Sequence, residues 1–177
     1  QRPSRLSVLA GKVIAVGAVV LAAAAAGLAL GALCSYLVSL AEGAPVSWPA
    51  IDRWLKALGA GWLGLATSAY LGLLLAVLLR SSALSVGIGL VYLLVVEGLL
   101  TGLAVLNDSL ETLAKALPGR NATDLAAAFG RSALPPQSGP LATEPVEPQQ
   151  AALVLAAYLI GFVALSALLF TRREVAS

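Results

Sequence analysis

Four long apolar runs divide the chain, at residues 13–41, 57–79, 81–106 and 151–171. None of them alternates apolar and polar residues as a half-buried strand does, and all are rich in Ala and Leu. A helix rises about 1.5 Å per residue, so about 20 apolar residues cross a hydrocarbon core of about 30 Å. Only helices and closed barrels satisfy the backbone in lipid. The pattern therefore predicts an all-α membrane bundle, a single domain with four transmembrane helices, the third helical over 83–106.

The spacing of the runs adds two details. The first run is longer than a bilayer needs, so its helix either tilts or emerges from the membrane near Ser39. The second and third runs are separated only by a short turn around Arg80 and Ser81. Those two helices are therefore expected to be antiparallel neighbours.

Residues 107–150 are more polar and interrupt the apolar pattern. Asn107-Asp108 offers a helix cap, with Glu111 three residues after Asp108 as its reciprocal partner. Apolar residues then recur on one helical face as far as Leu117, and Pro118-Gly119 is predicted to end this helix. The expected product is a short amphipathic helix at the outer surface of the membrane.

A second short helix is predicted over 122–129, with Asn121 as its cap and Gly130 after its end. Residues 134–149 contain five Pro and no periodicity, which indicates an extended loop. Asn107 and Asn121 also begin matches to the short N-glycosylation pattern, which is common by chance. The alternative for the whole segment is a packed linker without a role of its own.

Composition supports a membrane protein and excludes several other classes. Only 11% of the residues are charged, 59% are apolar, and the net charge is +2. These values exclude a disordered chain, a collagen-like chain and a nucleic-acid binder, and they disfavour a soluble domain. The chain has no His and one Cys, Cys34, so it offers no His/Cys metal site and no internal disulfide. It also has no Met, and we expect further sequence upstream.

The basic residues of short loops predict the orientation. They fall before the first run, between the second and third, and after the fourth, which places them all on one side of a four-helix bundle. The two loops on the other side are net neutral and net acidic. The positive-inside rule makes the basic side cytoplasmic, with both ends of the chain on it. The cytoplasmic anchors are Lys12, Arg80, Arg172 and Arg173, together with Arg2 and Arg5.

Three tryptophans lie near the expected outer surface. Trp48 and Trp54 fall in the first outer loop, and Trp62 lies just inside the second run. Tryptophan favours the headgroup level of a bilayer, so we interpret the three as interfacial anchors, with chance placement as the alternative.

Glu97 is the one charged residue inside an apolar run, and it lies near the middle of the third helix. A charge at that depth costs about 2.5–3.5 kcal/mol on insertion scales, so its side chain is expected to face protein or water. It belongs either to a substrate path or to a polar contact that packs helices together. Thr101, four residues on, shares its helical face, whereas Tyr92, five residues back, does so less well.

No catalytic or cofactor site is evident in the sequence. Gly87 and Gly89 lie inside an apolar run and are not followed by the Lys-Ser/Thr of a phosphate loop. The serines and threonines of the helices have no His or intramembrane Lys to act as a base. We therefore expect neither enzyme activity nor a cofactor or metal, and any energy must come from a partner or a gradient.

Four motifs together resemble the bacterial ATP-binding-cassette (ABC) transporter permeases of the type-2 exporter family. They are similar to the basic lead-in to the third helix of that family, its tight cytoplasmic turn, the outer segment before its last helix, and its closing basic motif. The matching residues are Pro3-Ser4-Arg5 with Gly11-Lys12, Leu79-Arg80-Ser81-Ser82-Ala83, Leu117-Pro118-Gly119, and Phe170-Thr171-Arg172-Arg173-Glu174. The family more often has Asp where this chain has Glu174.

The resemblance implies that these are the last four of six helices in a permease of the bacterial cytoplasmic membrane. It implies pairing with a second permease copy or a related subunit, and with cytoplasmic ABC ATPase subunits. Arg2 and Arg5 would then border the ATPase contact, and the chain would export a substrate. Two alternatives remain: a non-transport scaffold or assembly subunit, and a membrane enzyme or secondary transporter.

Overall fold

The computed structural model describes residues 5–46, 48–79, 81–104, 107–130 and 145–172. The described residues form helices and connecting segments without strands, which confirms the all-α prediction. In chain order the elements are α1 (Arg5–Glu42), α2 (Ile51–Leu79), α3 (Ser82–Val91), the π-helical η1 (Tyr92–Val96), α4 (Glu97–Ala104), α5 (Asp108–Ala116), α6 (Pro118–Gly130) and α7 (Pro148–Arg172).

Four helices of the described chain are long and apolar enough to cross a membrane: Ser7–Glu42, Ile51–Leu79, Ser82–Ala104 and Pro148–Phe170. They match the four predicted runs. The first, second and fourth begin several residues before the apolar runs do, because a helix continues through polar residues at a membrane surface. The third consists of α3, η1 and α4 in direct succession.

α1 ends in a glycine-dependent cap. Gly43 has φ 65°, the left-handed conformation that glycine adopts without a Cβ penalty. The Ala44 N–H donates to the Ser39 carbonyl at 3.0 Å, which is the long hydrogen bond of a Schellman motif. The cap turns the chain back towards α2. Beside it the Tyr36 ring stacks on Trp48, and the Trp48 and Trp54 rings are tilted against each other.

Side-chain hydrogen bonds fasten α1 to α2. The Tyr70 hydroxyl donates to the Val13 carbonyl at 2.8 Å, and the Trp62 indole N–H donates to the Gly17 carbonyl at 3.1 Å. Both donors stand on α2 and both acceptors belong to the backbone of α1. Trp62 thus serves helix packing, in addition to any role at the membrane surface.

The core lies where α2, α6 and α7 meet. It consists of Ala60 from α2, Leu125 from α6, Val146 just before α7, and Ala151 and Leu155 within α7. The Thr67 hydroxyl lies in the same region and bonds the Leu63 carbonyl of its own helix at 2.8 Å. Small residues allow close approach of these helices, as is usual for packing within membranes.

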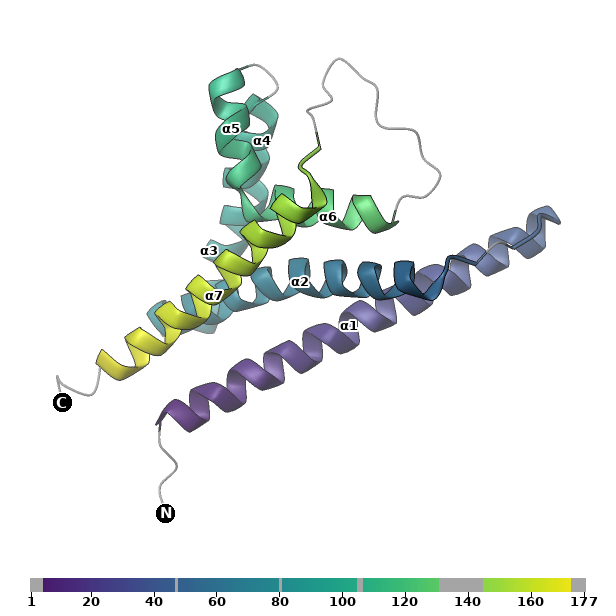
Figure 1. The fold of residues 1–177 in the computed structure, drawn as a ribbon. Coiled ribbons are helices and arrows are strands. Elements are labelled where there is room, and N and C mark those ends of the chain that lie inside the picture. Colours follow the sequence, from purple (N-terminus) through teal and green to yellow (C-terminus); the bar gives the residue numbers. More distant parts are fainter. Residues whose placement is uncertain (1–4, 47, 80, 105–106, 131–144, 173–177) are drawn as a thin grey trace.

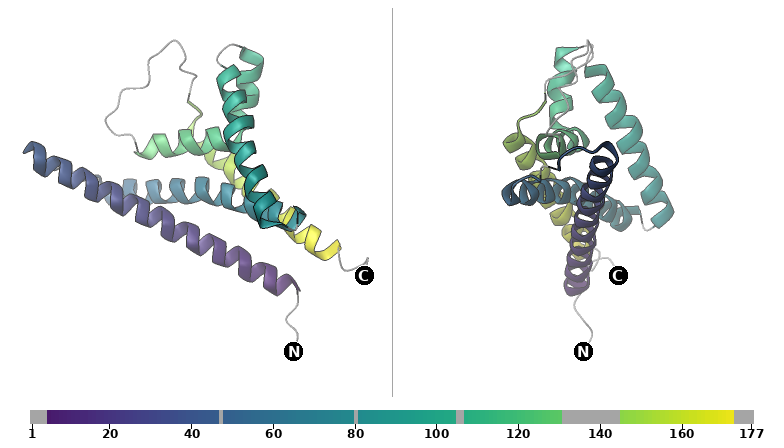
Figure 2. Two further views of the ribbon diagram at one scale, coloured as in Figure 1. Left: turned by 180° about the vertical axis from the view of Figure 1, so that it is seen from behind. Right: turned by 90° about the vertical axis from the view of Figure 1, so that its right-hand side faces the viewer.

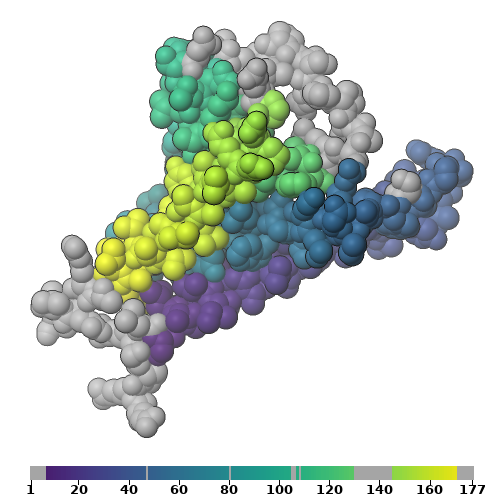
Figure 3. Space-filling model, in the orientation of Figure 1, coloured from purple at the N-terminus to yellow at the C-terminus, as the bar shows by residue number. Residues whose placement is uncertain are grey.

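The molecule divides into two packing units (Figure 1). The body consists of α1, α2, α6 and α7, which run side by side. The arm consists of α3, η1, α4 and α5, and it stands steeply against the body, as both views of Figure 2 confirm. In the space-filling view, α7 covers part of α2 and the arm rises beyond them (Figure 3).

The beginning of α1, the α2–α3 turn and the end of α7 lie at the same end of the body (Figures 1 and 2). These are the element ends that carry the predicted cytoplasmic anchors. The Ser81 side chain accepts from the Leu84 N–H at 3.3 Å and so caps α3 directly after the short turn.

Candidate functional site

A π-helical turn precedes Glu97 in the third membrane helix. The N–H of Glu97 donates to the carbonyl of Tyr92, five residues back, instead of to the carbonyl four residues back. Such π turns are inserted into α-helices mostly at functional positions. Here the wider turn places Tyr92 and Glu97 on one face, which an uninterrupted α-helix does not do.

The Glu97 side chain is buried, with 5% of its surface exposed. Its carboxyl group lies close to Gly119 and near the Tyr92 side chain. Its Oε1 atom is buried and has no hydrogen-bond partner among the described residues. Tyr158 of α7 lies close enough to Tyr92 for the two hydroxyl groups to interact electrostatically. Two parts of the bundle, the third long helix and α6, therefore meet at this carboxyl.

Thr101 lies one α-helical turn after Glu97 in α4, as its spacing predicts. It is half-buried on α4, and no hydrogen bond connects it with Glu97 in the part of the chain that the structure describes. The residue that joins Glu97 is Tyr92, because the π turn changes the register between them. The α-helical spacing rule fails here because one turn of the helix is not α-helical.

Gly119 lies against the Glu97 carboxyl. A Cβ atom at this position would overlap Glu97 Oε2 and lie 2.9 Å from its Cδ, so only glycine fits here without a shift. Gly119 is the second residue of α6, and its N–H is one of the groups that a helix N-terminus leaves unpaired. The carboxyl thus lies at a helix N-terminus, where the helix dipole favours a negative group.

The boundary between α5 and α6 differs from its prediction. α5 ends at Ala116 as expected, but Pro118 begins α6 instead of serving only as a terminator. Proline fits the first helical position, because its fixed φ suits a helix and its missing N–H needs no partner there. The tip of this hairpin reaches Glu97, about 10 Å from the Ala104 end of the third helix at 1.5 Å per residue.

Asn121 is a residue of α6 and not its cap, which corrects the sequence prediction. Its side chain is fully buried. Its Nδ2 atom donates to the carbonyls of Lys115 at 2.8 Å and Leu117 at 2.7 Å, so it fixes the end of α5 to the start of α6. A buried Nδ2 with two acceptors is not available as a glycosylation site. The polar Pro-Gly-x-Asn sequence is the only sequence signal of this role.

The cap of α5 is also shifted by one residue from its prediction. Asn107 is the N-cap, and its Oδ1 accepts from the Ser109 N–H at 3.0 Å. Glu111 forms an ion pair with Lys115 at 3.0 Å instead of completing a capping box with Asp108. An Asn at the N-cap is as favourable as an Asp, so propensity did not distinguish the two positions.

A second buried polar contact holds the chain that leads into α7. Arg120 Nε lies 3.5 Å from Asp124 Oδ2, and their side chains are 4% and 19% exposed. The same Oδ2 accepts from the Val146 N–H at 3.1 Å. This contact fixes the entry to α7 on α6, and we assign it no chemistry of its own.

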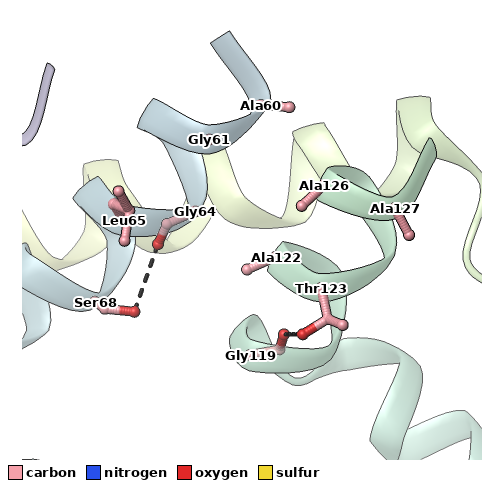
Figure 4. Close-up of a pocket in the computed structure, with 10 residues that line it drawn as sticks. All are labelled: Ala60, Gly61, Gly64, Leu65, Ser68, Gly119, Ala122, Thr123, Ala126 and Ala127. Atoms are coloured by element: carbon pink, nitrogen blue, oxygen red, sulfur yellow. Dashed lines mark hydrogen bonds between the residues drawn. The ribbon is translucent and has the colours of Figure 1, made fainter. Parts of the chain in front are cut away.

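An open groove of about 580 Å³ lies between α2 and α6 (Figure 4). Small residues line it, and its two hydroxyl groups are occupied: Ser68 bonds the Gly64 carbonyl at 3.4 Å and Thr123 bonds the Gly119 carbonyl at 3.0 Å. The groove is therefore apolar in character. The lining residues are Ala60, Gly61, Gly64, Leu65, Ser68, Gly119, Ala122, Thr123, Ala126 and Ala127.

The predicted cytoplasmic residues are only partly within the described chain. Lys12 is exposed on α1. Arg5 and Arg172 are the first residue of α1 and the last of α7. Arg2, Arg80 and Arg173 lie outside the described residues. Within the described ranges, no group of three metal-ligating side chains occurs.

Comparison with known proteins identifies no relative of this chain. No family model matches the chain, and neither a curated protein nor a solved structure matches it. The fold and the site define the class: a multi-pass membrane protein, built as an all-α bundle with a polar contact inside its third long helix.

Proposed function

We propose that this chain is a transmembrane permease subunit of an ABC transporter of the type-2 exporter kind. In this proposal it forms part of a pathway across a bacterial cytoplasmic membrane, with both ends of the chain in the cytoplasm. It moves a substrate outward with energy from ATP, which a separate cytoplasmic ATPase subunit hydrolyses. A second permease, identical or related, completes the pathway.

The observation that carries the proposal is the helical hairpin between the last two long helices. Leu117-Pro118-Gly119, one of the four motifs of the resemblance, lies at its tip beside Glu97. A hairpin with a buried polar tip is more elaborate than a loop that only connects two helices. The four motifs occur in the order and at the spacing that the resemblance requires, within a bundle of suitable topology.

Co-purification tests this proposal. The full-length protein is extracted from its own membranes in mild detergent, and everything that elutes with it is identified by mass spectrometry. We expect a soluble ATPase in stoichiometric amount and ATP hydrolysis by the complex. A protein that elutes alone, or with membrane subunits only, contradicts the permease proposal and favours the scaffold alternative.

Variants of the residues predicted to border the ATPase contact provide a second test. Replacing Arg2 and Arg5 by Glu is expected to reduce the amount of co-purified ATPase at equal expression. Replacing Arg53 and Lys56 by Glu, near the start of α2 on the predicted opposite side, serves as the control with the same change of charge. Equal recovery of ATPase from all three proteins argues against a contact near Arg2 and Arg5.

A further inference from the structure

The groove between α2 and α6 has an apolar end and a polar end. Ala60 of α2 packs in one cluster with Leu125 of α6. About one turn later in α2, a Cβ at Gly64 would lie 3.1 Å from the Cβ of Ala122, which is about one turn earlier in α6. The two helices therefore run antiparallel, and Ser68, a further turn along α2, lies towards the start of α6 (Figure 4).

The Glu97 carboxyl lies at this second end of the groove. Residues three, four and seven apart share one face of a helix, so Gly119 points the same way as Ala122, Thr123 and Ala126, which line the groove. A Cβ on Gly119 would overlap Glu97 Oε2. The carboxyl therefore takes the place of a side chain on the groove face of α6, one turn before Thr123.

This carboxyl lacks a partner for one of its oxygens. Glu97 is 5% exposed, and its Oε1 has no hydrogen-bond partner among the described residues. The ion pairs found within the described ranges use other acids, Asp52, Glu111 and Asp124. A buried carboxylate is unfavourable unless hydrogen-bond donors or a cation compensate it. The carboxyl therefore offers a place for a positively charged donor.

The two hydroxyl groups of the groove also present acceptors at this end. Ser68 and Thr123 donate their hydrogens to the backbone carbonyls of Gly64 and Gly119. A hydroxyl that donates keeps lone pairs on its oxygen, so both oxygens can still accept. These groups favour an ammonium head group and disfavour an anionic one.

The rest of the groove suits an alkyl chain. Its volume of about 580 Å³ is within the usual range of ligand pockets, and the groove is open along one side. Towards the other end its walls carry only small or apolar side chains. These residues are Ala60, Gly61, Leu65, Ala126 and Ala127.

We propose that this groove binds a single-chain amphiphile with a protonated primary amine as its head group. The ammonium group donates to Glu97 Oε1, and the alkyl chain lies between α2 and α6 towards Ala60 and Ala127. The open side admits the amphiphile laterally from the lipid. Binding needs no ATPase, so the site is tested separately from the proposed permease function.

Photocrosslinking of the full chain in lipid nanodiscs tests the site. The probe is dodecylamine with a diazirine near the end of its chain, and mass spectrometry identifies the labelled peptides. We expect labelling to be concentrated in residues 58–65 and 122–129, around the apolar end of the groove. Excess dodecylamine is expected to prevent this labelling. Dodecanol and dodecanoate have the same chain, and neither is expected to compete, because one lacks the charge and the other is repelled by the carboxylate.

Glu97→Gln tests the head-group contact. The probe concentration for half-maximal labelling is expected to rise about tenfold or more, because a hydrogen bond to a charged group becomes a neutral one. Glu111→Gln removes a carboxylate from the neighbouring helix α5 and is the control, with an expected wild-type concentration. Circular dichroism confirms equal helix content of the compared proteins.

Ala126→Phe tests the chain contact, because the ring fills the groove from a position on its wall. Labelling of residues 58–65 is expected to be lost. Ala128→Phe is the matched control, since Ala128 is exposed and points away from the groove face of the same helix. It is expected to be labelled like the wild-type protein.

Three results overturn the proposal. The first is labelling spread evenly over the long helices, which indicates ordinary contact with lipid. The second is equal competition by dodecanol, which makes the groove a slot for alkyl chains without a head-group site. The third is a wild-type concentration for half-maximal labelling in Glu97→Gln. If Glu97→Gln does not accumulate in membranes, the comparison of the three competitors and of Ala126→Phe with Ala128→Phe decides.

Discussion

At the scale of single residues, glycines decide how closely these helices approach. Gly17 of α1 faces α2, and a Cβ there would lie 3.0 Å from the Tyr70 hydroxyl. That hydroxyl already donates to the Val13 carbonyl at 2.8 Å. Gly27, farther along the same helix, has nothing within 4 Å. The structure therefore leaves room for a side chain at Gly27 but not at Gly17 of the same helix.

Gly17→Ala is expected to destabilise the bundle by about 1–2 kcal/mol, since the methyl group pushes the Tyr70 hydroxyl from its acceptor. Gly27→Ala is the control and is expected to be neutral or stabilising by up to about 1 kcal/mol, because alanine is the better helix former. Reversible unfolding in mixed detergent micelles measures both. Equal stability of the two variants contradicts the assigned α1–α2 contact.

Asn121 is the polar residue on which the hairpin tip depends. Asn121→Ala leaves the carbonyls of Lys115 and Leu117 without this donor, and a loss of about 1–3 kcal/mol is expected. Thr123→Ala removes an exposed hydroxyl that bonds only its own helix, and a change below about 0.5 kcal/mol is expected. The same unfolding assay compares them, and a similar loss in both variants refutes the role given to Asn121.

At the scale of elements, the π turn determines which way the side chains of α4 face. It contributes one extra residue to a turn, so the face of α4 is rotated by about 100° relative to an uninterrupted helix. Glu97 comes directly after it, which is why Glu97 faces α6. No proline lies near the turn, so composition gives no signal of it.

Deletion of Val95 is expected to convert the π turn into a regular α-helical turn. Val95 is 48% exposed, so the deletion removes no buried contact of its own. Glu97 then follows Tyr92 by four residues in a regular helix and keeps the face that meets α6, so amides of residues 118–121 are expected to keep their wild-type protection from hydrogen exchange, measured by mass spectrometry. Val95→Ala keeps the residue count and is the control. Loss of protection at residues 118–121 after the deletion contradicts the register argument.

At the scale of the whole molecule, the distribution of basic residues predicts which side faces the cytoplasm. In a Cys34→Ala background, a cysteine at Glu147 is expected to react with a membrane-impermeant thiol reagent in intact cells. A cysteine at Ser7 is expected to react only after permeabilisation, because the basic flanks stay inside. Labelling is read on gels. The reverse pattern refutes the orientation, and labelling of both in intact cells refutes an odd number of spans between them.

The four long helices are predictable from sequence because each depends on a local property, a run of apolar residues without charges. The amphipathic pair between the last two long helices is predictable for the same reason. The position of their tip is not, because it depends on Gly119 meeting Glu97, a residue of another element. The sequence offered Tyr92 only as a poorer partner of Glu97 than Thr101, since helical spacing rules assume an α-helix throughout.

The buried contact of Arg120 with Asp124 implies an order of biogenesis. A segment with these charges is not apolar enough to enter the lipid on its own, so translocation across the membrane comes first. The hairpin can make all of its contacts with the body only after Val146 and α7 have been synthesised. Asp124 accepts a hydrogen bond from the Val146 N–H, and Leu125 belongs to the same core cluster as Leu155. The hairpin therefore folds back into the bundle from the far side, after the last helix has left the ribosome.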